Sequence, residues 1–263
     1  MPFPEVERVI YKSNPLIKVI CQYRFTPILK IDSEIPSDFQ EKIRDVFPLY
    51  FERTVNRQEL VSEPKPGMSP DFINLMSKSS SLKNHEFVSP DGTLKVNLTR
   101  TYLALSTSKY EKWEDFYSSF CHIMEEFMKI YNPPFFTRIG LRYTDVFNRT
   151  NLGIPELAWD RLINPMFLGI LSSPISKSIE NFESVYEIAL ADSLSKVRIV
   201  NSFLIHQPSL EKCFMVDSDF YTSKRMNLED SNQKLDFLHK RATRLIRWII
   251  TDELHRLMRP ENI

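Results

Sequence analysis

The chain contains very little glycine, with only 5 glycines among 263 residues. Phosphate-binding loops and dinucleotide-binding turns need closely spaced glycines, and none of their motifs occurs in the sequence. Long apolar runs are also missing, because no uninterrupted stretch approaches the ~18 residues of a membrane-spanning helix. No basic-then-apolar leader opens the chain either. We therefore expect neither a nucleotide-loop enzyme nor a membrane protein.

The formal net charge and the number of cysteines are low as well. Lys plus Arg equals Asp plus Glu at 34 each, whereas a dedicated nucleic-acid binder usually carries a basic excess. The three cysteines, Cys21, Cys121 and Cys213, are odd in number and far apart. They fit reduced thiols better than a disulfide framework, and we expect a cytoplasmic protein.

The apolar residues, which make up 42% of the chain, recur at strand and helix spacing. Alternation and β-branched content predict strands at residues 16–25, 72–77, 85–89, 94–99, 101–107, 136–147, 182–191, 196–205 and 212–220. A 3.6-residue period predicts helices at residues 36–47, 113–131, within 155–171 with a break near Pro165, and 228–258. The pattern is typical of a folded α+β protein.

Several motifs occur twice, about 120 positions apart, which is the length of a small domain. Arg24-Phe25-Thr26 is repeated as Arg142-Tyr143-Thr144, each within an apolar run. Ile35-Pro36 and Ile154-Pro155 open a helical segment at similar distances after these motifs. The spacing predicts a duplication of one structural unit.

We therefore predict two halves, residues 1–134 and 135–263, each with the order β-α-β-β-β-α and a fourth strand optional in the first. Consecutive strands separated by short turns predict antiparallel sheets, and the long helices would cover them. This element order resembles the helix-grip and TATA-binding-protein-like folds.

Two arginines lie at equivalent places in the repeated strands. Strand alternation puts Gln22 and Arg24 on one face, and Arg138, Arg142 and Thr144 on one face of the other strand. If the two strands pair, Arg24 and Arg142 lie close together on a polar sheet face. Guanidinium groups keep their charge and require an anion.

Three interpretations of this face remain open. Carboxylates of the same chain, such as Glu187, Asp217 and Asp219, satisfy the arginines. Alternatively, the face binds a small anionic ligand or nucleotide, or it is a surface without a role. A saddle-shaped sheet that binds nucleic acid is a further alternative, which the net charge does not support.

The last helix carries a basic stretch that is a candidate partner site. Its members are Lys240, Arg244, Arg247 and the neighbouring Trp248. Arg and Trp are enriched at interaction hot spots, so a protein partner or a second copy of the chain is one interpretation. A solvated helix face is the other.

Catalytic and metal motifs find no support in the sequence. Asp236 and His239 share a helix face, but His255 lies about four turns further along and cannot join them. No two cysteines have metal-knuckle spacing, and no Gly-x-Ser-x-Gly occurs. We predict no catalytic residue, no metal and no cofactor, and a non-enzymatic role is favoured over an enzyme.

The segment from Asn14 to Phe25 resembles the opening of a sporadically distributed bacterial family of conserved hypothetical proteins. The likeness continues through Arg138 to Tyr143, Leu235 to His239 and Ile250 to Asp252. Such families are often found beside defence or toxin–antitoxin genes and carry no assigned reaction. The resemblance implies a binding or neutralising component of such an operon, and it transfers no catalytic residue.

Overall fold

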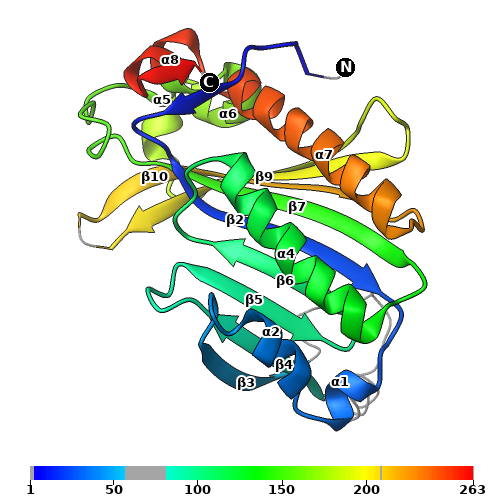
Figure 1. Ribbon diagram of the computed structural model, residues 1–263. Coiled ribbons are helices and arrows are strands. Elements are labelled where there is room, and N and C mark those ends of the chain that lie inside the picture. Colours follow the sequence, from blue (N-terminus) through cyan, green and yellow to red (C-terminus); the bar gives the residue numbers. More distant parts are fainter. Residues whose placement is uncertain (1–2, 57–80, 208, 263) are drawn as a thin grey trace, which may run out of the picture.

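The computed structural model describes residues 3–56, 81–207 and 209–262, and its main element is a nine-stranded sheet (Figure 1). All neighbouring strands are antiparallel. The strand order is β3 (Leu49–Asn56), β4 (Ser81–Val88), β5 (Leu94–Thr99), β6 (Tyr102–Thr107), β2 (Leu16–Phe25), β7 (Phe136–Phe147), β10 (Glu211–Thr222), β9 (Ser195–His206) and β8 (Glu183–Ala189). The α+β class with a large antiparallel sheet is thereby confirmed.

The two long helices, α4 (Trp113–Tyr131) and α7 (Leu228–Ile249), lie on the same face of this sheet (Figure 1). Their apolar stripes face the strands and bury Phe116, Phe120 and Phe127 in α4, and Leu235 and Leu238 in α7. None of the helices in the described ranges lies on the opposite face. The sheet therefore has one covered face and one helix-free face.

Shorter helices fill the ends of the covered face. They are α1 (Lys30–Ser33), α2 (Ser37–Ile43), α5 (Trp159–Leu162), α6 (Pro165–Leu168), α8 (Asp252–Leu257) and 3₁₀ turns at Gly169–Ser172 and Ser176–Ser178. Strand β1 (Val9–Tyr11) pairs with β11 (Pro260–Asn262), so the first and last segments meet in a two-stranded sheet. Among the helices that the structure describes, none is both long and apolar enough to cross a membrane.

The centre of the large sheet is the pairing of β2 with β7. Side chains alternate along β2, where Cys21, Tyr23 and Phe25 are buried toward the helices and Arg24 is exposed on the other face. Tyr23 is fully buried, and its hydroxyl donates a hydrogen bond to the Ser231 carbonyl at 3.0 Å. One continuous sheet and core therefore cross the boundary between residues 134 and 135.

Two predicted helices differ from the structure. The helix expected at residues 228–258 is interrupted at Ile250, which is extended and forms a β-bridge with Ile163. The helix expected within 155–171 is reduced to α5 and α6, because Pro165 starts a separate turn. Strand β3 was not predicted, and the strand predicted at residues 72–77 lies outside the described residues.

Candidate functional site

The predicted arginine site lies on the helix-free face, with a register that differs from the expected one. Arg24 is opposite Arg138 in the β2–β7 ladder, and Arg142 is opposite Ile20. Arg24 and Arg142 therefore share a face but are four residues apart along the ladder, roughly 13 Å at strand spacing. The residue across the ladder from Arg24 is therefore Arg138, and not Arg142 as the sequence predicted.

Carboxylates of β10 pair with both arginines of β7. Arg142 forms a two-pronged ion pair with Asp217, with its Nε donating at 2.7 Å, and Arg138 Nη2 contacts Asp219 at 2.7 Å. Gly140 leaves room for the ion pair between Arg138 and Asp219, because a Cβ at this position would collide with the Arg138 guanidinium. Internal pairing, one of the three interpretations, therefore describes Arg138 and Arg142.

Arg24 has a different environment. Its Nε donates to Gln22 Oε1 at 2.9 Å, and no carboxylate within the described ranges lies at ion-pair distance. Burial, and the like charge of Arg138, lower the pKa of Arg24 from its usual value. Thr144 contacts Asp217 at 3.5 Å and joins the internal network. The five residues predicted to bind an anion thus form a mostly self-neutralised surface.

The predicted partner stretch on α7 is also paired internally. Its three basic residues contact acids of the same chain: Lys240 with Asp236, Arg244 with Glu5, and Arg247 with Asp252. Trp248 is partly buried, with its ring 5.5 Å from that of Phe3 and 5.1 Å from that of Phe167. These side chains hold the N-terminal segment and α6 against α7.

A cavity of about 120 Å³ lies on the covered face, between α7 and the sheet. Strands β7 and β10 form its floor, and residues 242–249 of α7 form its roof. Residues 7–11 and 110–113 form its sides. Its floor residues are Tyr143, Asp145, Val216 and Ser218. We call this space the α7 cavity.

Asp145 is the unusual member of the cavity floor. It lies on the inward face of β7 and is 6% exposed. Its carboxyl group has no side-chain hydrogen bond or ion pair with any residue that the structure describes. Burial, with a smaller contribution from the charge of Asp217, raises the pKa of Asp145 to about 7. A buried carboxyl without a partner is costly when ionised.

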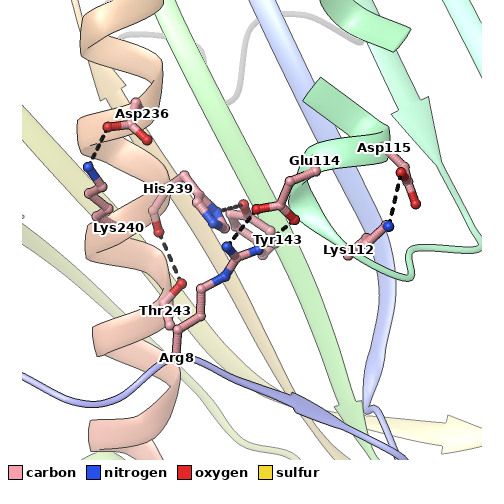
Figure 2. Close-up of polar contacts among 9 residues, drawn as sticks. All are labelled: Arg8, Lys112, Glu114, Asp115, Tyr143, Asp236, His239, Lys240 and Thr243. Atoms are coloured by element: carbon pink, nitrogen blue, oxygen red, sulfur yellow. Dashed lines mark hydrogen bonds and ion pairs between the residues drawn. The ribbon is translucent and has the colours of Figure 1, made fainter. Parts of the chain in front are cut away.

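His239 projects from α7 into the same cavity (Figure 2). Its Nδ1 lies 2.9 Å from the Tyr143 hydroxyl, and its ring stacks on Trp113 with centroids 4.0 Å apart. Burial, with a smaller contribution from Arg8, lowers the pKa of His239 to about 4, so the imidazole is neutral at pH 7. Its Nε2 is buried and has no hydrogen-bond partner among the described residues.

His85 shows how this chain satisfies a structural histidine. Both of its ring nitrogens are used, because Nδ1 lies 3.0 Å from the Tyr50 hydroxyl and Nε2 lies 2.9 Å from the Ile31 carbonyl oxygen. His239 has the same tyrosine contact at Nδ1 but lacks the second one. Leaving a buried polar group unsatisfied typically costs ~1–3 kcal/mol. Among the described residues, the Nε2 of His239 is therefore a polar atom without a partner that is also closed to solvent.

The N-terminal segment closes one side of the cavity. The two terminal nitrogens of Arg8, Nη1 and Nη2, donate to the Glu114 carboxylate at 2.6 and 2.9 Å, beside His239 (Figure 2). This ion pair lowers the pKa of Glu114 to about 2. The Tyr11 hydroxyl lies 2.8 Å from His255 Nδ1, and the β1–β11 pairing anchors the same segment. Contacts between residues far apart in the sequence therefore hold this side of the cavity in place.

The cavity offers hydrogen-bonding and proton-exchanging groups rather than a nucleophile. Burial raises the pKa of the Cys21, Cys121 and Cys213 thiols, which makes their thiolates scarce at neutral pH. Within the described ranges, no three His, Cys, Asp or Glu side chains are placed to hold a metal ion.

Sequence reasoning considered His239 only as a metal ligand and did not identify Asp145. A signal for Asp145 was present, because alternation along β7 places it on the same inward face as Leu141 and Tyr143. A carboxylate on an apolar strand face is uncommon unless it is paired. Arg138 and Arg142 are an odd number of residues from these positions and lie on the opposite face, where the sequence predicted the site.

No protein-family model matches the chain, and the search of curated proteins gives no match. The resemblance to a bacterial family of conserved hypothetical proteins remains a prediction from the motifs.

Proposed function

We propose that this protein is a non-enzymatic binding protein whose α7 cavity holds a small organic molecule. The supporting observation is that the Asp145 carboxyl lines this cavity, belongs to a residue that is 6% exposed, and has no side-chain hydrogen bond or ion pair in the described chain. Binding sites are typically apolar cavities with a few such polar groups. A ligand that satisfies this group would offset its desolvation.

A fragment screen by thermal shift tests this proposal. Binders at high excess over their Kd should raise the Tm by about 5 °C or more. Ala242→Leu would fill the roof of the cavity and should abolish these shifts. Ala158→Leu, an exposed position before α5, is the matched control and should retain them. Shifts that survive in Ala242→Leu, or a screen without any binder, would contradict the proposal.

The helix-free face supports a second candidate, which is a protein partner docked on the sheet. The pairing of Arg138 and Arg142 with acids removes two cations that nucleic acid or a small anion would use. A partner with its own mixed charges suits such a surface better. Binding to single-stranded DNA that weakens steeply with salt would instead favour the nucleic-acid alternative.

The biological role that we propose follows from the family resemblance. In this proposal the protein is a cytosolic accessory or neutralising component of a defence or toxin–antitoxin operon, and ligand occupancy of the cavity reports a cellular state to its partner. Purification from the native host with and without the bound ligand would test this link. If the ligand does not change the amount of partner that is recovered, ligand binding and partner binding are independent of each other.

We also propose that the two halves arose by duplication. Support comes from the strand order, in which β6, β5 and β4 follow outward from β2, and β10, β9 and β8 follow outward from β7. Each half also contributes one long helix to the covered face (Figure 1). Superposition of β2, β6, β5 and α4 on β7, β10, β9 and α7 is the direct test.

A further inference from the structure

We propose that the α7 cavity selects a small organic cation, an amine or amidine with an apolar body, whose nitrogen donates to the Asp145 carboxylate. This inference rests on the proposed binding function and specifies the chemistry of its ligand. It is argued from two features of the cavity: its uncompensated acid, and its size and lining.

Asp145 is a buried acid of this cavity that has no counter-charge among the residues that the structure describes. The guanidinium groups that also line the cavity are already paired, Arg8 with Glu114 and Arg247 with Asp252. Asp217 lies behind Asp145 on β10, and its negative charge disfavours a second anion nearby. An ammonium or amidinium group would supply the missing positive charge, whereas a carboxylate or phosphate ligand would face electrostatic repulsion.

The charged and titratable groups around Asp145 come from every packed element. They are Glu7, Arg8 and Tyr11 of the N-terminal segment, Tyr110, Glu111 and Lys112 before α4, His239 and Arg247 of α7, Tyr143 of β7, and Asp217 of β10. The cations among these groups are paired with acids: Arg8 with Glu114, Arg247 with Asp252, and Lys112 with Asp115, whose Oδ1 lies 3.5 Å from the Lys112 Nζ. Thus the local field does not already neutralise Asp145.

The size and lining of the cavity limit the rest of the ligand. A volume of about 120 Å³ is close to the ~150 Å³ of an apolar cavity that accepts benzene. Leu16, Val216, Leu245 and Ile246 provide apolar walls, and Tyr110 and Tyr143 provide aromatic ones. Aromatic rings also attract cations. The ligand should therefore have roughly the size of benzylamine.

Calorimetric titration of the full-length protein with benzamidine, benzylamine, benzyl alcohol and benzoate tests this selectivity. We expect benzamidine and benzylamine to bind at least about tenfold more tightly than benzyl alcohol, and benzoate not to bind. Asp145→Asn should reduce the affinity for both cations by about tenfold or more, because the charge-assisted contact is lost. Asp160→Asn, the same change at an exposed acid, should leave it unchanged.

Proton release adds a readout in the wild-type protein, which remains informative if Asp145→Asn does not fold. Below neutral pH the cation must displace a proton from Asp145, so its affinity should fall as the pH is lowered, and protons should be released on binding. Equal affinity for benzyl alcohol and benzylamine, or preferential binding of benzoate, would contradict the proposal that the ligand is a cation. Neither result would contradict the proposal that the cavity binds a small molecule. A cavity that binds none of the four probes and no fragment would overturn both proposals.

Discussion

Asp145 and His239 are two buried ionisable residues whose pKa values are displaced in opposite senses. Burial raises the pKa of Asp145 to about 7 and lowers the pKa of His239 to about 4. Both residues therefore favour their neutral form more than they would in water, which fits their burial between α7 and the sheet. Their neighbours Arg8 and Glu114 remain a charged pair at the more exposed edge.

These displacements predict opposing contributions to stability. Asp145 binds its proton more tightly in the folded state, so its contribution is present below about pH 4 and is lost as the pH rises to about 7. His239 binds its proton more weakly in the folded state, so its contribution is present above about pH 6.5 and is lost as the pH falls to about 4. Between these limits the two offset each other in the wild-type protein.

Single variants should reveal the hidden pH dependence. Relative to the wild type, Asp145→Asn should gain stability as the pH rises from about 4 to about 7, by at most ~1.4 kcal/mol per pH unit. His239→Gln should instead lose stability relative to the wild type as the pH rises to about 6.5. Urea unfolding at several pH values measures both. Parallel curves for all three proteins would show that neither residue titrates as described.

Helix α7 is the element on which the cavity depends, because it provides the roof and carries His239. Its start is fixed locally, since the Asn227 side chain accepts a hydrogen bond from the Asp230 backbone N–H at 2.8 Å. Its end is fixed by a distant contact, the β-bridge between Ile250 and Ile163. Apolar residues continue through Ile249, Ile250 and Leu254, which is why the sequence predicted one uninterrupted helix.

Removing the cap of α7 should have a defined cost. Asn227→Ala should lower the free energy of unfolding by ~1 kcal/mol, because the first turn loses an acceptor for its free N–H groups. Asn227→Asp should retain most of the stability, since aspartate is an equally good cap and its charge favours a helix N-terminus. Denaturant unfolding measures both variants. A neutral Asn227→Ala would show that packing alone defines the start of α7.

At the scale of the whole molecule, the β2–β7 pairing joins the two predicted halves into one sheet. Trp113 at the start of α4 stacks on His239 of α7, so the helix layer also connects them. Separating residues 1–134 from 135–263 would expose the paired edges of β2 and β7 and the core beneath them. Unpaired central strands are aggregation-prone.

The full chain should consequently unfold in one cooperative transition. Tryptophan fluorescence and far-UV circular dichroism should give coincident urea curves, because neither half retains a complete core alone. The isolated fragments 1–134 and 135–263 should be unfolded or aggregated, and mixing them should restore part of the signal. Two separate transitions, or independently folded fragments, would contradict this description.

The sequence by itself determined the α+β class, most strands of the large sheet and the two long amphipathic helices, because burial imposes a period of 2 on strands and 3.6 on helices. It also indicated that carboxylates such as Asp217 and Asp219 could satisfy the arginines. Only the tertiary structure decided the register that places Arg138 opposite Arg24. Likewise, the α7 cavity requires residues 7–11, β7, β10 and α7 to meet. Such contacts depend on long-range packing, which local periodicity does not encode.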